Sequence, residues 1–498
     1  MSDQGRNNRS PQSQARRGRA GNSAQPRESG QRGTTRTVQP ARRVAFDVLR
    51  AVSETDAYAN LVLPSAIADA RLTPQDAALA TELTYGTLRR LGTYDAIIAS
   101  AADRATDTID PAVLDALRLA VHQLLATRVA SHAAVNESVN LAAIASGRGA
   151  SSFVNAVLRR ITRDSVETWQ TRIEEQARSD DERLALRSAH PVWVIRALRR
   201  ALAAEGRADE LEALLEADNA SPEVTLVALP GLAEPDEPRL PYASTAFTSP
   251  GGDPRLSVDR SGGTIRVQDE GSQLVALALA SAAPIVAGER WLDLCAGPGG
   301  KTALLGAIAL QHDVTLEANE VVPVRARLVR KALRAVPGEI EVHEQDGRQL
   351  ATSRAGEFDR VLVDAPCTGL GALRRRPEAR WRKSPADVAE LVPLQVELLS
   401  AALDALAPGG IAAYVTCSPH LAETTGVVKE VLRERTDIVE LDARAVVTGT
   451  AQSPIDLAAE GRSGSGSVQL WPHRHGTDAM FLALLQRSAT ATGDRKED

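Results

Sequence analysis

Hydrophobic residues recur at helical spacing through the first third of the chain. They stand three or four positions apart in segments 41–52, 74–99, 111–127, 132–145 and 151–161. Thr73 and Asp110 each precede a proline, as an N-cap precedes Pro at the first helical position. The pattern predicts an all-α module over 41–165, and helical spacing continues through "HPVWVIRALRRALAAEG".

The pattern changes twice after this module. Residues 228–263 are rich in Pro, Gly and Ser, so we expect 166–265 to be a helical and loop linker region. From residue 266 short apolar runs alternate with helical segments: "RWLDLC", "DVTLEANE", "IEVHEQD", "FDRVLVDAPC" and "GGIAAYVTC". This alternation predicts βαβ units and an α/β domain with a mostly parallel sheet over 266–488. "SVQLWPHRHGTDAMFLALLQ" is expected to close it as a β-hairpin, and 489–498 to form a flexible tail.

Composition adds a charge asymmetry and excludes several classes of protein. The net charge is -6, yet residues 1–40 hold eight Arg against Asp3 and Glu28 and almost no apolar side chains. They predict a disordered basic arm that favours nucleic acid. Three scattered cysteines exclude a disulfide framework and a zinc site. Neither a signal peptide nor a membrane span is apparent, so we expect a cytoplasmic protein without a membrane or metal partner.

A glycine-rich turn follows the first predicted strand of the α/β domain. In "WLDLCAGPGGKT" the glycines allow a tight turn and close backbone approach to a ligand, although nicotinamide sites and plain chain reversals share this feature. The strands end in four acids: Asp293, Glu320, Asp346 and Asp364. Because ligands of open α/β sheets bind beyond the carboxyl ends of the strands, these acids predict a cofactor site.

Two cysteines follow strands in the same way. Cys367 stands in "VDAPCTG" and Cys417 in "YVTCSP". A free cysteine is often only a small buried hydrophobic side chain, which is our interpretation of Cys295 in "DLCAG". For the pair we favour chemistry, because both would lie at the same sheet edge as the acids.

These motifs together resemble a known family. "QDEGSQL", "DLCAGPGGKT", "DAPCTGLGALRRRPEARWR", "TCS" and "GTDAMF" occur in the order seen in S-adenosylmethionine-dependent RNA cytosine-5 methyltransferases of the RsmB (Sun/Fmu) type. The likeness covers about 220 residues. The all-α part, with "AVNESVNLA" and "FVNAVLRRI", is similar to the NusB-type RNA-binding domain. The resemblance implies a Rossmann-like class I methyltransferase domain preceded by a NusB-like domain, with 16S rRNA as the partner and no obligate protein partner.

The resemblance also implies a cofactor site for S-adenosylmethionine. The Asp293 carboxylate and the Gly297–Lys301 loop would lie near the methionine moiety, Glu320 on the ribose and Asp346 near the adenine. The implied cofactor-binding set is Asp293, Cys295, Ala296, Gly297, Pro298, Gly299, Gly300, Lys301, Glu320, Asp346 and Asp364.

The chemistry explains a need for a thiol. Cytosine C5 is a weak nucleophile, so a thiolate adds to C6 and loads electron density onto C5. The resemblance assigns this attack to Cys417 and assistance in product release to Cys367, with Asp364 beside N3 and the exocyclic amine of the base. DNA cytosine-5 methyltransferases instead attack from the Pro-Cys cysteine and use an E-N-V motif, which this sequence lacks.

A basic stretch beside the catalytic turn predicts an RNA contact. Phosphates attract cations, while Arg and Trp stack on unpaired bases, although such a run can also be a solvated helix face. The candidates are Arg374, Arg375, Arg376, Arg380, Trp381 and Arg382, with Lys383 next to them.

Several alternative functions are compatible with the sequence. The same chemistry could act on tRNA or another rRNA site, and a noncatalytic RNA-binding assembly factor could keep the fold, although it would need neither cysteine. Ala479 and Met480 depart from the family's usual glycine and aromatic residue in the last motif. His473 and His475 lack partner ligands for a metal, and 440–467 gives no functional signal.

Overall fold

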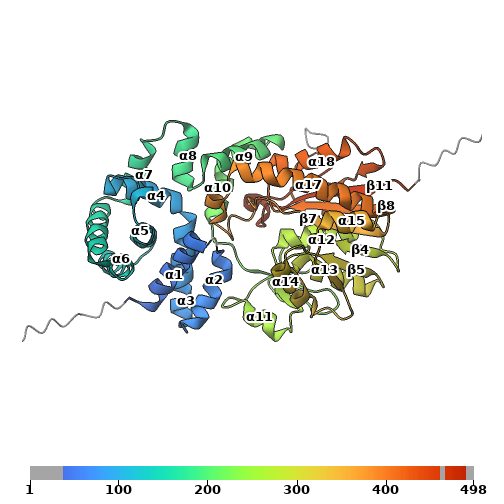
Figure 1. Cartoon of the computed structure of the whole chain (residues 1–498), viewed down its shortest axis with the longest axis horizontal. Helices are drawn as coiled ribbons and strands as arrows, with labels where there is room; N and C mark the ends of the chain where they lie inside the picture. Colours follow the sequence, from blue (N-terminus) through green and yellow to red (C-terminus); the bar gives the residue numbers. More distant parts are fainter. Residues whose placement is uncertain (1–37, 56, 460–465, 490–498) are drawn as a thin grey trace, which may run out of the picture. The chain divides into compact units, whose positions relative to one another are not determined.

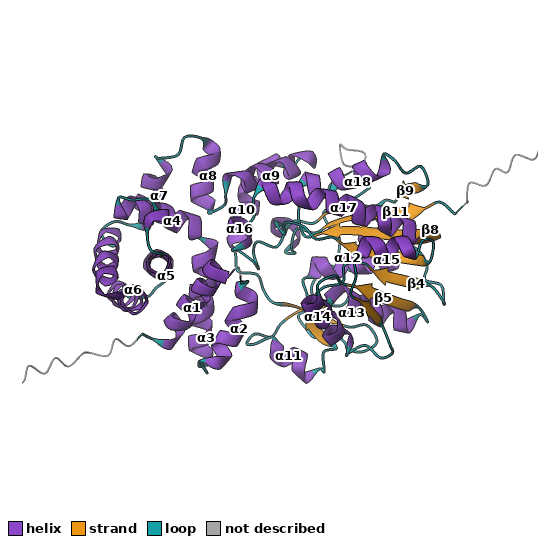
Figure 2. Ribbon diagram, viewed as in Figure 1, coloured by secondary structure: helices purple, strands orange, loops and turns teal. Residues whose placement is uncertain are grey.

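The computed structural model describes residues 38–55, 57–459 and 466–489. Only 38–40 of the predicted basic arm and residue 489 of the predicted tail fall within this part of the chain. Strands gather in one portion of the described chain, while the portion nearer the N-terminus is helical (Figure 2). Among the described residues, no helix is long and apolar enough to cross a membrane.

The N-terminal portion is a helical module, as its hydrophobic spacing predicts. Its elements are α1 (Pro40–Thr55), α2 (Ala59–Asp69), α3 (Pro74–Arg89), α4 (Leu91–Ala102), η1 (Thr106–Thr108), α5 (Pro111–Ala126), α6 (Ser131–Ile161), α7 (Val166–Glu174) and α8 (Asp180–Ser188) (Figure 1). The Thr73 and Asp110 side chains accept hydrogen bonds from the first turns of α3 and α5, which confirms both N-caps. The predicted segment 74–99 is two helices that meet at Arg90, and Gly147 (φ 84°) divides α6 where the sequence separates two helices.

The predicted linker region 166–265 is helical in its first part, as expected, but its second part contains strands that were not expected. It continues with α9 (Val192–Ala204), η2 (Ala208–Glu210), α10 (Leu211–Asn219), β1 (Thr225–Ala228), β2 (Ala246–Thr248), α11 (Arg255–Arg260) and β3 (Ile265–Val267). The three strands form an antiparallel sheet in the order β2-β1-β3. Strands of three or four residues are too short to show a period-2 pattern, so the Pro and Gly around them conceal this sheet.

The large sheet has the doubly wound arrangement expected of the α/β region. Its order is β10-β11-β8-β7-β4-β5-β6, with β9 paired to β11. The strands β4 to β8 are parallel neighbours, whereas β11 is antiparallel to β8 and pairs with β10 as the predicted hairpin. The strands are β4 (Arg290–Asp293), β5 (Thr315–Asn319), β6 (Glu341–His343), β7 (Phe358–Asp364), β8 (Leu406–Thr416), β9 (Ile438–Glu440), β10 (Val468–Gln469) and β11 (Phe481–Arg487).

Helices cover both faces of this sheet because successive residues of each strand point to opposite sides. Trp291 packs with α12 and α13, while its neighbour Leu292 packs with α15 and α17. The same alternation separates Ala413 from Ala412 on β8. The helices are α12 (Glu270–Ser281), α13 (Gly300–Gln311), α14 (Pro323–Leu333), α15 (Gly347–Ser353), α16 (Ala379–Arg382), α17 (Pro385–Ala405), η3 (Leu421–Glu423), α18 (Thr425–Leu432), α19 (Ala443–Thr450) and α20 (Pro472–His475).

Candidate functional site

The glycine loop between β4 and α13 is packed so closely that side chains are excluded from it. A Cβ at Gly297 would lie 2.1 Å from the Glu320 carboxylate, and one at Gly299 would lie 2.9 Å from the Cα of Val329 on α14. Gly299 also has φ 102°, which only glycine adopts without strain. The loop therefore presents bare backbone at the carboxyl edge of the central strand.

Asp293, the last residue of β4, is a buried acid with one free oxygen. Its Oδ2 accepts a hydrogen bond of 2.7 Å from Thr302 Oγ1, while Oδ1 has no partner among the described residues. Burial, reinforced by the negative charge of Asp364, raises the pKa of Asp293 to about 7. A buried, unpaired carboxylate oxygen at this edge is suited to accept a hydrogen bond from a cationic ligand.

This pKa makes a prediction about stability. Because the folded value lies above that of an unfolded Asp, the folded state holds the extra proton between about pH 4 and 7, and stability falls as pH rises through that window. Asp293→Asn should remove this dependence of stability on pH. At pH 8 and without cofactor, the variant should be more stable to unfolding than wild type, by at most about 4 kcal/mol. Thermal unfolding at pH 5 and pH 8 measures it; an unchanged slope in the variant would contradict the assignment.

Glu320 follows β5 and is held against the glycine loop. Its Oε2 accepts from the Gly297 amide at 3.1 Å and its Oε1 from the Val322 amide at 2.9 Å. Arg325 approaches the same carboxylate at 3.4 Å and donates to the Gly297 carbonyl at 2.6 Å. The acid predicted at the end of the second strand is thus brought to the loop.

Asp346 is placed beyond β6 but is engaged elsewhere. It caps α15, and hydrogen bonding to Arg348 holds the pKa of its carboxyl below the usual value. Its expected role beside adenine remains a prediction.

Asn319 is a site residue that the sequence analysis missed. It is the buried last residue of β5, and its amide nitrogen donates to the Leu294 carbonyl at 3.2 Å and the Gln345 carbonyl at 3.1 Å. Its side-chain oxygen accepts from the Gln345 amide at 3.3 Å. One side chain therefore joins the loops that follow β4 and β6. The only signal in the sequence is an amide residue directly before Glu320.

Lys301 and Asp364 join the glycine loop to the cysteines. Lys301 Nζ donates to Asp364 Oδ2 at 2.7 Å, with the lysine side chain largely buried. Burial alone would lower the pKa of Lys301, but the adjacent Asp364 carboxylate outweighs it and raises that pKa. The lysine thus keeps a positive charge beside the reaction edge.

The structure brings Cys367 and Cys417 together. Their sulfur atoms, in the loops after β7 and β8, lie 3.5 Å apart. The hydrogen bond with Cys367, helped by Arg376 and Lys301, lowers the pKa of Cys417 despite its burial. The same bond, together with burial, raises the pKa of Cys367 well above the usual value. Of the two thiols, Cys417 is therefore the one that loses its proton more readily.

Cys295 differs from the pair. It is partly buried and packs against the hydrophobic cluster under β4, and burial raises the pKa of its thiol. A thiol with a raised pKa is a poor nucleophile, in keeping with a packing role.

The basic stretch 374–382 is built into the protein and corrects our RNA prediction. Arg380 is fully buried and donates to the Asn219 side chain at 2.8 Å and to three backbone carbonyls, those of Ala189, Asp218 and Arg89. The expected RNA contact of Arg380 is therefore wrong in this structure.

Its neighbours are also used internally. Arg374 donates to the Gly476 carbonyl, Arg375 binds Asp269 and Asp478, and Arg382 donates to the Val52 and Ala57 carbonyls. The Trp381 ring packs so closely on Gly92 that a Cβ there would lie 2.1 Å from it. Of the six candidates only Arg376 is exposed, with its guanidinium over the Tyr58 ring. These residues join the helical module to the sheet.

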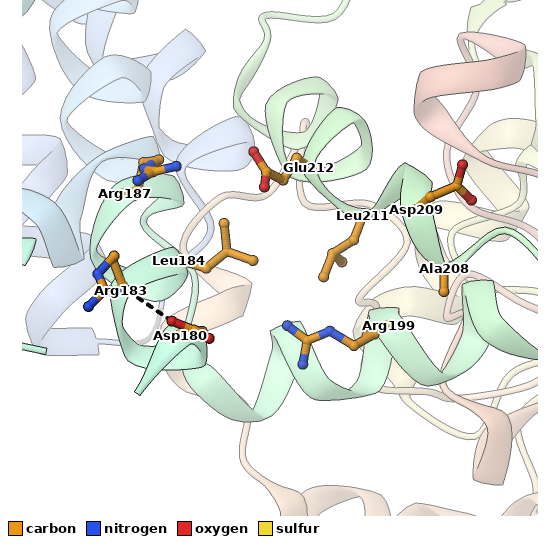
Figure 3. Close-up of a pocket in the computed structure, with 9 residues that line it drawn as sticks. All are labelled: Asp180, Arg183, Leu184, Arg187, Arg199, Ala208, Asp209, Leu211 and Glu212. Carbon is orange, nitrogen blue, oxygen red and sulfur yellow. Dashed lines mark hydrogen bonds and ion pairs between the residues drawn. The ribbon is translucent and has the colours of Figure 1, made fainter. Parts of the chain in front are cut away.

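A separate cavity of about 420 Å³ lies among α8, α9 and α10 (Figure 3). Its arginines are neutralised by acids, since Arg183 pairs with Asp180, Arg187 with Glu174 and Arg199 with Asp181. None of its lining residues comes from the large sheet. We assign it no chemistry.

Comparison with known proteins decides the family. The sequence profile of the 16S rRNA methyltransferase RsmB/F family matches residues 281–486, and that of the NusB family matches residues 39–163. A ribosomal RNA small subunit methyltransferase B of Pseudomonas syringae is 31% identical over 466 residues, which cover 90% of this chain and 97% of that protein. The chain belongs to the RsmB/F family of rRNA methyltransferases.

Further relatives support membership of the RsmB/F family. A Mycobacterium tuberculosis protein that carries the name of a methyltransferase, without a stated substrate, is 49% identical over 93% of this chain and 99% of its own length. The crystal structure of PH0851 shares the fold, with a TM-score of 0.74 over 91% of this chain and 99% of that one at 22% identity. As an RsmB/F family member, the chain uses S-adenosylmethionine as its methyl donor.

Proposed function

We propose that this RsmB/F family member methylates C5 of a cytosine in 16S rRNA through a covalent bond between Cys417 and C6 of the base. The observation that carries the proposal is the cysteine pair, whose sulfurs lie 3.5 Å apart and in which the pKa of Cys417 is lowered while that of Cys367 is raised. Relatives are named as small-subunit rRNA methyltransferases, which supports the choice of RNA.

S-adenosylmethionine supplies an electrophilic methyl group when bound. The residues at the sheet edge fit it: the free Asp293 Oδ1 can accept from its ammonium group, and the Gly297–Lys301 loop leaves room that a Cβ would fill. Glu320, the next acid along the edge, would accept hydrogen bonds from the ribose hydroxyls. To do so, Glu320 would give up the hydrogen bond that it now accepts from the Gly297 amide.

Different residues of the protein carry the successive steps of the reaction. The Cys417 thiolate forms the S–C6 bond, and the displaced electron pair moves onto C5, which takes the methyl group. Asp364, whose cationic partner is Lys301, would lie beside N3 and the exocyclic amine of the base and accept from the proton that N3 gains in the adduct. A water molecule acting as base takes the C5 proton, the C–H electron pair restores the C5–C6 double bond, and the S–C6 bond breaks to return Cys417 as a thiolate, a release that Cys367 assists. Each bond formed to the enzyme is thus broken before product leaves.

Because most of the basic stretch 374–382 is used inside the protein, we expect RNA to bind at α14 instead. Residues 323–334 contain five cations and no acid, in a chain of net charge -6. Arg325 and Arg330 pair with acids, whereas Arg327, Lys331 and Arg334 are exposed and have no ion pair within the described part of the chain. At i, i+4 and i+7 they share one helix face, and α14 packs on the glycine loop through Val329. We expect this face to bind phosphates of the RNA.

Exchanging Arg327, Lys331 and Arg334 together for Ala should weaken RNA binding. The slope of log K against log salt should become shallower by roughly 2 to 3, because about one counterion is released for each phosphate contact. Filter binding at several salt concentrations measures it. Arg433→Ala, which removes an exposed arginine at the C-cap of α18 paired with Glu430, is the matched control and should change nothing. Equal slopes for the triple variant and the control would contradict this surface.

The proposal is tested by methyl transfer from labelled S-adenosylmethionine to undermodified 16S rRNA and to bulk tRNA, with the modified base identified. Labelled 5-methylcytosine at one rRNA position is the expected result. Label in tRNA alone would keep the chemistry and overturn the substrate, and no label in either would favour the noncatalytic assembly factor.

A further inference from the structure

A buried acid outside the described machinery joins the two cysteine loops. Glu423, at the end of η3, is fully buried. Its Oε1 accepts from the Thr368 amide at 2.8 Å and its Oε2 from the Ser418 hydroxyl at 2.6 Å. Thr368 directly follows Cys367 and Ser418 directly follows Cys417. One carboxyl group therefore holds the residue after each cysteine.

The remaining groups that contact the Glu423 carboxylate are hydrogen-bond donors as well. The Thr368 hydroxyl donates to Oε2 at 2.5 Å, and Gln395 of α17 donates to Oε1 at 3.3 Å and also to the Pro366 carbonyl at 2.8 Å. The Glu423 backbone carbonyl accepts from the Tyr414 hydroxyl at 2.8 Å. A carboxylate can accept several bonds without donating, so this set of partners suits a negative charge.

We propose that Glu423 is a positioning residue that locks the two cysteine loops in register and whose negative charge keeps the shared proton on Cys367 Sγ, leaving Cys417 Sγ as the thiolate. This inference rests on the proposed function, since it explains how the nucleophile is selected. A carboxylate beside Cys367 disfavours a second negative charge there, whereas Cys417 faces cations.

The charged groups around the pair agree with this division. The hydrogen bond with Cys417 and burial raise the pKa of Cys367 most, and the charges of Glu423 and Asp364 add to this effect. Cys417 also faces Asp364, but Arg376 and Lys301 oppose that effect. His420, whose ring nitrogen accepts from the Ala422 amide within η3, and Tyr414, whose hydroxyl donates to the Glu423 carbonyl, are further titratable neighbours of Glu423. Of the two acids, Asp364 therefore acts on both thiols, whereas Glu423 is among the main influences on Cys367 alone.

The test is the pH profile of alkylation of each thiol, read by peptide mass spectrometry on the full-length protein without RNA or cofactor. In wild type Cys417 should react at lower pH than Cys367. Glu423→Gln keeps the size of the side chain and removes the charge, so the Cys367 profile should move down by about 1 pH unit. Ser418→Ala removes one of the hydrogen bonds to the Glu423 carboxylate, together with the hydrogen bonds of the Ser418 hydroxyl with Thr368 and His420, and keeps the charge, so it should leave the Cys367 profile in place.

Glu423→Asp is the second variant, because it keeps the charge and shortens the reach. It should preserve the Cys367 profile while lowering kcat about tenfold with KM for RNA unchanged, through looser loops. If Glu423→Gln leaves the profile of Cys367 unmoved, or if Glu423→Asp moves it equally far, the inference fails while the proposed function stands. If Cys367 is the more acidic thiol in wild type, the assignment of the nucleophile in the proposed function fails instead.

Discussion

Cys417→Ala is expected to reduce methyl transfer to 16S rRNA by roughly 10³-fold or more, because C5 of cytosine has no other source of electron density once the attacking thiolate is removed. The structure supports a large effect, since Cys417 is the cysteine of the pair with the lowered pKa and lies within the influence of Lys301 and Arg376. Single-turnover transfer of labelled methyl groups measures it.

The thermal stability and the cofactor affinity of the Cys417→Ala variant serve as controls. The Cys417 side chain is partly buried at the end of β8, so Ala should leave Tm within a few degrees of wild type and cofactor affinity unchanged. Retained methyl transfer would mean that no covalent bond from Cys417 is needed. Retained biological function with transfer abolished would favour the assembly factor.

Arg380→Ala is expected to destabilise the protein by about 3 to 5 kcal/mol, seen as a fall in Tm of several degrees. The guanidinium satisfies the Asn219 side chain and three backbone carbonyls in a fully buried position, and its removal leaves these acceptors without donors. Thermal unfolding measures the loss.

Arg376→Ala is the matched control for this second prediction. It removes a neighbouring arginine that is exposed, and should change stability by no more than about 0.5 kcal/mol. Equal Tm values for Arg380→Ala and wild type would show that Arg380 is not a structural residue and would return it to the RNA surface.

The sequence predicts the sheet edge well because strand ends carry their own signal. Asp293, Glu320 and Asp364 each close or follow an apolar run, and parallel strands bring such ends to one edge. The cysteine pair follows from the same reasoning. Their 3.5 Å separation does not, because it depends on the conformation of two loops fifty residues apart in the chain.

Other residues could not be found from the sequence. Asn319 and Glu423 act by joining loops that meet only in the fold, and nothing in "EANE" or "LAETT" distinguishes them from solvated polar residues. In the sequence, Arg380 and Arg327 look alike, because each lies in a run of cations. In the structure Arg380 is fully buried and Arg327 is exposed. The burial of a long cationic side chain is decided by the carbonyls that surround it, and these come from distant segments.

The most direct test of the covalent account is a search for a trapped adduct in Cys367→Ala incubated with 16S rRNA and S-adenosylmethionine. Without the cysteine that assists release, we predict a protein–RNA complex that survives denaturation and yields, after digestion, a methylated cytosine on the peptide that contains Cys417. An adduct formed instead by Cys417→Ala, with the base attached to Cys367, would contradict the account.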